Sequence, residues 1–149
     1  MNKNLKILFF ADAAAEHTLR WSNYFAQIGH EVHVVSWNDL SESFVKHNND
    51  DSNSPFHPAK LHLLGGKKPK NKLSYILWVI KLILNVRKLH KKIAPDLIHS
   101  HSVGSYAWIT LFLPNTLTIM TPWGTDVLID MKKSAINRFF SIRSMKKCS

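Results

Sequence analysis

Three stretches of this sequence end an apolar run with side chains that could bind or transform a polar ligand. The sequence Thr-Pro-Trp-Gly-Thr-Asp at 121–126 follows the run at 117–120, which is typical of a buried strand. His99 and His101 lie in a second run at 96–101, and His17 follows a third run at 5–10. Open α/β sheets bind their ligands beyond the carboxyl ends of the strands. We therefore expect these three ends to meet in one site.

The carboxylate of Asp126 fits three roles at such a strand end. It could bind sugar hydroxyls, orient a base, or cap the turn that follows, since Asx side chains are strong caps. Trp123 could stack on the apolar face of a sugar or on its own neighbours. His17 could hydrogen-bond a ligand hydroxyl or be an ordinary loop residue. Its loop reads Asp-Ala-Ala-Ala-Glu-His without glycine, which disfavours a phosphate cradle at this turn.

His99 and His101 flank Ser100, so the alternation of a strand places both on one face. Such a pair could form half of a metal site, and only His17 or Asp126 could supply a third ligand. We favour the other interpretation, in which no metal is bound. His99 is then a buried, hydrogen-bonded histidine, while His101 and Ser102 face the crevice as polar contacts.

Strand-like runs alternate with stretches of helical periodicity along most of the chain. Strands are expected at residues 6–11, 31–36, 60–64, 96–101 and 117–120, and helices at about 18–28, 73–93, 104–113 and 133–146. The first strand–helix–strand unit should cross over right-handed. This order predicts an α/β fold with a doubly wound parallel sheet. The polar stretch at 37–58 is interpreted as a surface excursion that is partly disordered.

Helical spacing also predicts which face of each helix is apolar. The first helix aligns four residues, Trp21, Tyr24, Phe25 and Ile28. The helix at 73–93 aligns five, Leu73, Ile76, Leu77, Ile80 and Leu84, and we interpret it as facing the core. It could instead lie on a membrane surface, but Lys81 interrupts it too early for a membrane span. The last helix is expected to bury Ala135, Phe139, Ile142 and Met145.

Composition and charge narrow the class of protein. The chain has 149 residues, 45% of them hydrophobic, a formal charge of +10 and one cysteine, Cys148. One domain without disulfides and without a visible signal peptide predicts a cytoplasmic protein. Residues 59–93 hold ten Lys or Arg and no acid, and residues 132–147 hold six and no acid. Nucleic-acid binding is disfavoured because stacking aromatics and the usual motifs are missing.

Four segments together resemble the N-terminal domain of a family 4 glycosyltransferase of the GT-B type. They are His-Thr-Leu-Arg-Trp at 17–21, Gly-His-Glu-Val-His-Val at 29–34, Pro-Asp-Leu-Ile-His-Ser-His at 95–101 and Thr-Pro-Trp-Gly-Thr-Asp at 121–126. The resemblance covers residues 6–145. It implies one Rossmann-like half of a two-domain fold, spanning residues 1–149 and incomplete, with the nucleotide-sugar-binding domain absent.

The resemblance implies transfer of a sugar, with retention of configuration and without a required metal or cofactor, from a nucleotide-sugar to a saccharide or lipid-linked saccharide. Many bacterial members build surface polysaccharide at the inner face of the membrane. Asp126 and His17 are then the candidate catalytic residues. The candidate substrate-binding residues are Arg20, His101, Ser102, Trp123, Gly124 and Thr125. The basic residues expected to dock on anionic lipid are Lys67, Lys68, Lys70, Lys81, Arg87 and Lys88.

This sequence departs from the family pattern at three points. Trp123 stands where many members have a histidine, the first loop lacks glycine, and no Glu-x7-Glu motif is present. One wall of a cleft cannot hold both donor and acceptor in a reactive geometry. We therefore expect the chain to be inactive alone, as a fragment or as half of a split enzyme that pairs with a separate C-terminal-half protein. The alternative is a non-catalytic basic module that docks on a membrane surface or on such a partner.

Overall fold

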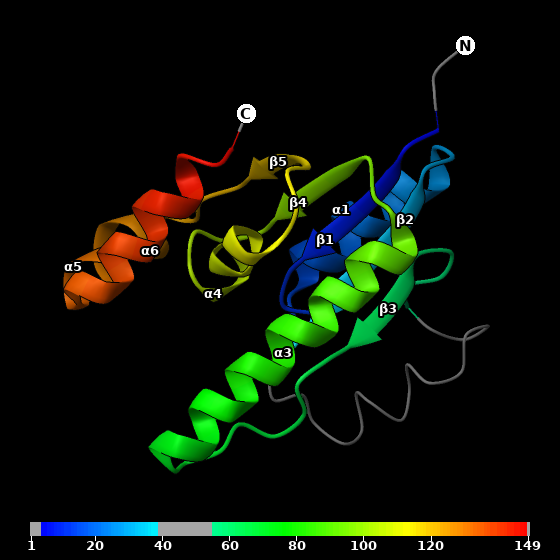
Figure 1. Ribbon diagram of the computed structural model, residues 1–149. Coiled ribbons are helices and arrows are strands. Elements are labelled where there is room, and N and C mark those ends of the chain that lie inside the picture. Colours follow the sequence, from blue (N-terminus) through cyan, green and yellow to red (C-terminus); the bar gives the residue numbers. More distant parts are fainter. Residues whose placement is uncertain (1–3, 39–54, 149) are drawn as a thin grey trace.

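A five-stranded parallel sheet forms the centre of the computed structural model, which describes residues 4–38 and 55–148 (Figure 1). The strand order is β3-β2-β1-β4-β5, and every neighbouring pair is parallel. The strands are β1 (Lys6–Phe10), β2 (Glu31–Ser36), β3 (Lys60–Leu63), β4 (Leu97–Ser100) and β5 (Leu117–Met120). The predicted α/β fold class, with a doubly wound parallel sheet, is confirmed.

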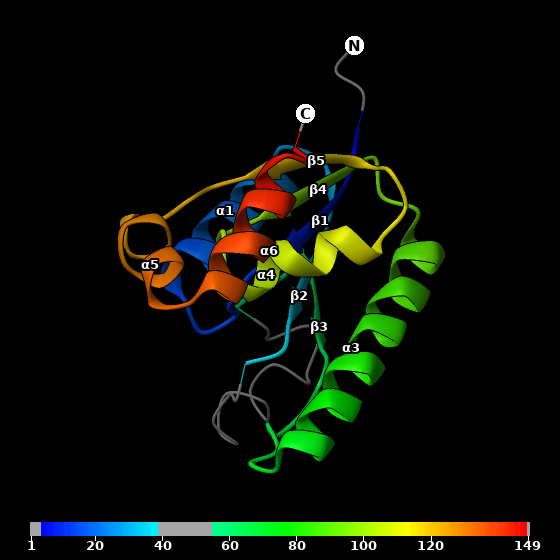
Figure 2. The ribbon, with the colours of Figure 1, turned by 60° about the vertical axis from the view of Figure 1, so that its left-hand side comes forward.

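Helices cover both faces of this sheet (Figures 1 and 2). They are α1 (Glu16–Gln27), α3 (Lys72–Ile93), α4 (Ser105–Trp108), α5 (Met131–Lys133) and α6 (Ala135–Met145), with a 3₁₀ turn at Ile109–Phe112 and a π-helical turn at Asp126–Asp130. Alternation along β1 divides the core, since Ile7 and Phe9 pack toward α1 whereas Leu8 and Phe10 pack toward α3 and α4. Continuous burial on both faces explains the unbroken apolar run of β1.

The predicted core face of α3 is wrong. The five aligned residues Leu73, Ile76, Leu77, Ile80 and Leu84 are all exposed. The helix instead buries Leu82, Val86, His90 and Ile93 against the sheet. Apolar residues occur on nearly every side of the first three turns, so periodicity alone could not choose the buried side.

The predicted buried face of the last helix, α6, is also wrong, and the predicted face of α1 is wrong in the same way. In α6, Ala135, Phe139 and Met145 are exposed, Ile142 is half-buried, and the fully buried residues are Ser141 and Ser144. In α1, which begins at Glu16 rather than 18, the buried residues are Thr18 and Ser22, whereas Trp21, Tyr24 and Ile28 are exposed.

Small hydroxyl residues form the buried faces of α1 and α6. The Ser22 hydroxyl donates to the Leu19 carbonyl (3.1 Å) and the Ser144 hydroxyl donates to the Phe140 carbonyl (2.8 Å). A hydroxyl that bonds its own helix backbone can be buried at little cost. Hydrophobic periodicity misses such a face because it counts only apolar residues.

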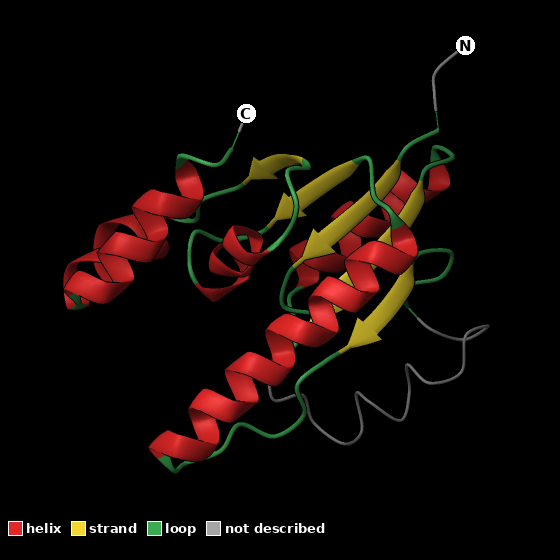
Figure 3. Cartoon of the chain, in the orientation of Figure 1, coloured by secondary structure: helices red, strands yellow, loops and turns green. Residues whose placement is uncertain are grey.

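The strand β5 is an edge strand rather than the fully buried strand that its sequence predicts (Figure 3). Thr118 is buried, but Leu117 and Ile119 are 53% and 45% exposed. The other end of the sheet is β3. The centre of the predicted surface excursion lies outside the described residues, and at its two sides Trp37 and Phe56 are buried.

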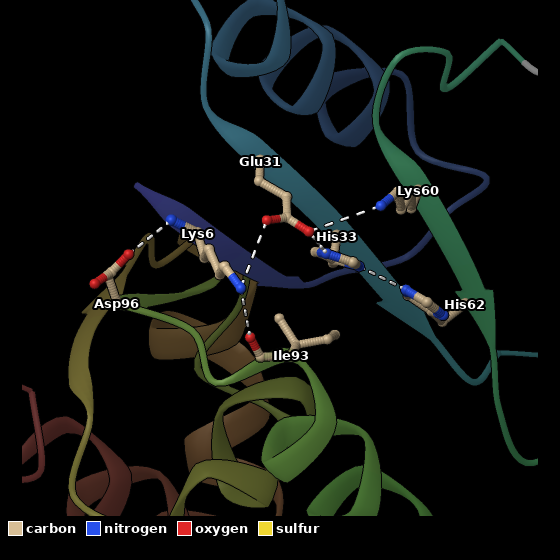
Figure 4. A network of polar contacts seen from close by, with 7 residues as sticks. All are labelled: Lys6, Glu31, His33, Lys60, His62, Ile93 and Asp96. Carbon is tan, nitrogen blue, oxygen red and sulfur yellow. Dashed lines mark hydrogen bonds and ion pairs between the residues drawn. The ribbon is translucent and has the colours of Figure 1, made fainter. Parts of the chain in front are cut away.

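A network of polar contacts connects β1, β2 and β3 near their amino ends (Figure 4). Glu31 accepts from the His33 ring (3.1 Å) and pairs with Lys6 and Lys60, both at 3.7 Å. The other His33 nitrogen lies 2.8 Å from the His62 ring. Lys6 and Glu31 are the first residues of β1 and β2, so this network lies at the edge opposite the carboxyl ends.

Candidate functional site

Backbone hydrogen bonds bring the three predicted strand ends together at the carboxyl edge of the sheet. Phe10, Ser100 and Met120 are in register across β1, β4 and β5. The amide of His101 donates to the Phe10 carbonyl and the amide of Thr121 donates to the Ser100 carbonyl, each at 2.9 Å. The residues that follow each strand therefore emerge side by side, which confirms that these ends share one edge.

An aromatic and imidazole cluster stands on this edge. The His17 ring lies 4.5 Å from the Trp123 ring and 5.6 Å from the His101 ring, between centroids. Trp21 meets His101 edge-on at 5.5 Å. The Trp123 indole N–H donates to the His101 carbonyl (2.8 Å), which ties the loop after β5 to the end of β4. We call His17, Trp21, His101 and Trp123 the edge cluster.

His101 is the buried member of the edge cluster. It is 4% exposed, and neither ring nitrogen has a hydrogen-bond partner among the described residues. Burial lowers the pKa of His101 to about 3, with smaller contributions from His99 and His17. The ring is therefore neutral near pH 7 and offers one N–H donor and one nitrogen acceptor. The prediction that His101 faces the crevice is corrected, because His17, Trp21 and Trp123 surround it.

His99 behaves as predicted for a buried, hydrogen-bonded histidine. Its Nε2 lies 2.8 Å from the Thr121 hydroxyl, and its ring packs against Phe9 and Trp21 at 5.0 and 5.3 Å. Burial lowers the pKa of His99 to about 4, so it too is neutral near pH 7. His99 lies in β4 and packs against two members of the edge cluster, Trp21 and His101.

The carboxylate of Asp126 anchors the loop that carries Trp123. Its Oδ2 accepts from the backbone amides of Val103 (2.9 Å) and Trp123 (3.3 Å). Those amides belong to the loop after β4 and the loop after β5, so one oxygen holds the two loops together. Oδ1 makes no hydrogen bond to any described residue. The prediction that Asp126 caps the turn that follows is wrong, because that turn has no side-chain cap and the amides bound by Oδ2 come earlier in the chain. Oδ1 is left to accept from a ligand.

The other predicted substrate-binding residues lie near this edge but outside the edge cluster. Arg20 is on α1, exposed, and paired with Glu16 at 2.5 Å. Ser102 follows β4, and its carbonyl accepts from the Ser100 hydroxyl (2.9 Å). Gly124 and Thr125 form the exposed first turn after β5. Gly124 has an ordinary φ, and a methyl group there would meet only Leu128 at 3.9 Å. Backbone geometry does not demand glycine at this position.

The predicted docking residues lie elsewhere, on and before α3. Lys81, Arg87 and Lys88 are exposed along the helix, and Lys67, Lys68 and Lys70 are exposed in the loop before it. Lys68 lies over the Trp78 ring at 6.0 Å from its centroid. No group of three His, Cys, Asp or Glu side chains within residues 4–38 and 55–148 is arranged to hold a metal ion.

This geometry agrees with a comparison against protein families. A family model described as Glycosyl transferase 4-like matches residues 6–147, from the start of β1 to beyond α6. The chain belongs to this glycosyltransferase family. No curated protein matches the chain. The match includes all five strands and the whole edge cluster, so the edge cluster is part of a glycosyltransferase 4-like domain.

Sequence reasoning misses two contributors to the candidate site, Trp21 and Thr121. Trp21 was assigned to the apolar face of α1, yet its ring packs edge-on against both His99 and His101. Its spacing of four residues from His17 on one helix was the available signal. Thr121, which bonds His99, was seen only as the first residue of a loop. No helix in the described part of the domain combines the length and apolar character of a membrane span.

Proposed function

We propose that this chain is the acceptor-side domain of a retaining, GT-B-type glycosyltransferase, the N-terminal half of that fold. The transferred sugar would come from a nucleotide-sugar, which is a donor substrate rather than a cofactor. The acceptor would be a saccharide or lipid-linked saccharide of the kind used in bacterial surface polysaccharide synthesis. Membership in the glycosyltransferase 4-like family supports the reaction class.

The single observation that carries the acceptor-side assignment is the chemistry of the edge cluster. Trp123 is 38% exposed and presents an indole face on which the apolar side of a sugar ring could stack. His17 is half-buried beside it, and Asp126 keeps Oδ1 available. An indole face for stacking, combined with a few hydrogen-bonding groups, suits a saccharide ring and its hydroxyls better than a nucleotide phosphate. The turn after β1 also has no glycine to admit a phosphate.

The reaction assigns a task to these residues. When the acceptor hydroxyl attacks the anomeric carbon, the bond from that carbon to the nucleotide oxygen breaks and the hydroxyl proton must leave. His17 and Asp126 are the candidate groups to position this hydroxyl and to accept its proton. A second domain would supply the donor and close the cleft against water. We propose that the nucleotide-binding wall is contributed by sequence or a partner beyond the described residues.

A turnover assay tests this assignment. Purified chain is incubated with radiolabelled UDP- and GDP-linked sugars and a bacterial lipid extract as acceptor. We expect no transfer and no donor hydrolysis by residues 1–149 alone. Transfer of label to the lipid fraction by the purified chain would show that both substrates bind here, and the acceptor-side assignment would be abandoned.

A further inference from the structure

A cavity lined by aromatic rings lies between the first half of α3 and the helices that follow β4. Its volume is about 260 Å³, just below the usual range of small-molecule sites, about 300–1,000 Å³. Residues of α3, α4, the 3₁₀ turn and α6 form its walls. Six of the lining residues are aromatic, namely Trp37, Tyr75, Trp78, Trp108, Phe112 and Phe140. We call this cavity the aromatic pocket.

The aromatic pocket is separate from the edge cluster. Trp37 and Leu82, which line the pocket, belong to the core on the α3 side of the sheet. The edge cluster instead contacts Phe9, which packs toward α1. The two sites therefore lie on opposite faces of the sheet. The first half of α3 extends past the carboxyl ends of the strands (Figures 1 and 3), and this half brings Trp78 to the pocket.

Contacts with neighbouring residues hold two of the indole walls in place. The Trp78 N–H donates to the Gly65 carbonyl, and a Cβ at Gly65 would come within 2.8 Å of the Trp78 ring. The Trp108 N–H donates to the Ser141 hydroxyl (3.2 Å). Because both N–H groups are already bonded, these walls offer a ligand apolar ring faces rather than hydrogen bonds.

A positive charge stands at the opening of the aromatic pocket. Lys68 is exposed and is the one charged residue among the described residues that line the cavity. Its ammonium nitrogen lies over the Trp78 ring, 6.0 Å from the centroid. Lys67, Lys70 and Lys72 are exposed in the same segment, and residues 59–93 contain no acid. A low-dielectric cavity bordered by charges of one sign focuses their potential at its opening.

These features favour a ligand with a flat apolar body and one acidic group. Aromatic rings prefer offset-stacked or edge-to-face contacts with other rings, and the walls of the aromatic pocket provide them. A saccharide suits the cavity poorly, because most of its hydroxyls would leave water without gaining a partner on apolar walls. A cationic ligand would be repelled by the positive potential at the opening.

We propose that the aromatic pocket binds a small aromatic carboxylate, with its ring among the indole walls and its carboxylate toward Lys68. A single carboxylate matches the charge of one ammonium group, and a single ring matches the small volume. This site lies outside the edge cluster. The inference therefore goes beyond the proposed function and does not depend on the proposed transferase activity.

Titration of the full chain with cinnamate tests the proposal, and cinnamyl alcohol is the uncharged probe of similar shape. Proton–nitrogen NMR follows the indole signals, which Trp78→Phe, Trp108→Phe and Trp123→Phe assign. We expect cinnamate to cause saturable shifts of the Trp78 and Trp108 signals and to leave the Trp123 signal in place. Cinnamyl alcohol should bind about threefold to fivefold more weakly, because it lacks the charge that faces Lys68.

Two adjacent positions of α3 provide matched variants. Val79 lines the aromatic pocket and is half-buried, whereas Ile80 is 49% exposed and is not among the lining residues. Val79→Trp fills the cavity and should weaken cinnamate binding about tenfold or more, a loss of about 1.4 kcal/mol. Ile80→Trp adds the same ring outside the cavity and should bind cinnamate like the wild type. Circular dichroism and thermal melting verify that both variants are folded.

A second pair of variants tests the charge. Lys68→Gln should weaken cinnamate binding to the affinity of cinnamyl alcohol, whereas Lys88→Gln removes a charge from the far end of α3 and should have no effect. Both lysines are exposed, so this pair tests the site even if Val79→Trp does not fold.

Three results would overturn the proposal. Cinnamate could leave the Trp78 and Trp108 signals unchanged at millimolar concentration. Val79→Trp and Ile80→Trp could bind cinnamate equally well, which would place the probe elsewhere on the chain. Finally, cinnamyl alcohol could bind the wild type as tightly as cinnamate does, and the assignment of an acidic ligand would then be wrong.

Discussion

His99 and His101 lie two residues apart at the carboxyl end of β4, yet their hydrogen bonding differs. His99 bonds the Thr121 hydroxyl, whereas neither nitrogen of the equally buried His101 has a partner among the described residues. A buried polar group without a partner costs about 1–3 kcal/mol of stability. A protein retains such a group where a ligand or a moving side chain satisfies it. The fold therefore satisfies the ring of His99, whereas the ring nitrogens of His101 have no partner among the described residues.

Substituting phenylalanine at each histidine should separate these two roles. His99→Phe leaves the Thr121 hydroxyl without its partner and should cost about 1–3 kcal/mol in the free energy of unfolding. His101→Phe removes only unsatisfied atoms, so its stability should stay within about 1 kcal/mol of the wild type or exceed it. Urea unfolding measures both. A larger loss for His101→Phe than for His99→Phe would show that the His101 ring is satisfied in solution.

Asp126 gives a second prediction for a single residue, because its Oδ2 joins two loops. Asp126→Ala removes the acceptor for the Val103 and Trp123 amides and should cost about 1–3 kcal/mol. Asp126→Asn keeps a carbonyl oxygen there and should cost less than half as much. Thermal melting of the two variants checks the order. If Asp126→Ala melts with the wild type, the carboxylate does not hold the loops.

Among the elements, α3 provides a matched test of which face packs on the sheet. Leu82 is 4% exposed and Leu84 is 59% exposed, two residues apart on the same helix. Leu82→Ala should cost about 2–5 kcal/mol because it leaves a cavity in the core. Leu84→Ala should stay within about 0.5 kcal/mol. Urea unfolding of both variants measures the two costs. A larger loss for Leu84→Ala than for Leu82→Ala would mean that the side of α3 with Leu84 faces the core.

The strands could be predicted from the sequence, whereas the buried helix faces could not. Apart from their first residues, the runs 6–10 and 31–36 are buried on both sides, and the apolar residues that dominate them are what a central parallel strand requires. In α1 and α6 the buried residues are Thr18, Ser22, Ser141 and Ser144, which hydrophobic periodicity does not register. In α3 there were too many apolar residues to choose between sides. Helix burial depended on tertiary shape rather than on local pattern.

The candidate site was predictable in its location and less so in its contacts. Parallel strands end at one edge, so His17, His101 and Trp123 could be placed together from sequence. Their stacking, the burial of His101 and the two amides on Asp126 depend on side-chain packing between α1 and the loop after β5. No spacing rule encodes those contacts. The roles assigned to these residues in binding and catalysis stay predictions.

At the scale of the whole molecule, burial lowers the pKa of several histidines, and we therefore expect the chain to lose stability in acid. Burial lowers the pKa of His62 and of His99 to about 4 and that of His101 to about 3; the charges of His33, Lys60 and Lys92 add to the shift of His62. An unfolded histidine titrates near 6.5, so below that pH the unfolded chain binds protons that the folded chain refuses. Stability should therefore be constant above pH about 6.5 and fall steadily toward pH about 4.

Urea midpoints measured from pH about 7 to about 4 check this slope. Acidification fully below its folded pKa would cost on the order of 3 kcal/mol for His99 alone. The variant His62→Gln should lose less stability over the same range than the wild type, because it has one fewer group that gains a proton on unfolding. A midpoint that does not change with pH would show that these rings are protonated in the folded chain.

The central claim is that the edge cluster of this glycosyltransferase 4-like domain binds a saccharide. The most direct measurement is a proton–nitrogen NMR spectrum of the five tryptophan indole groups, with and without glucose, galactose, N-acetylglucosamine and their disaccharides. The account predicts that the indole signal missing in Trp123→Phe shifts with at least one saccharide. The signal of Trp108, whose indole bonds Ser141 outside the edge cluster, should not move. Saccharides that leave the Trp123 signal in place, with UDP or GDP moving it instead, would contradict the account and make this edge a nucleotide site.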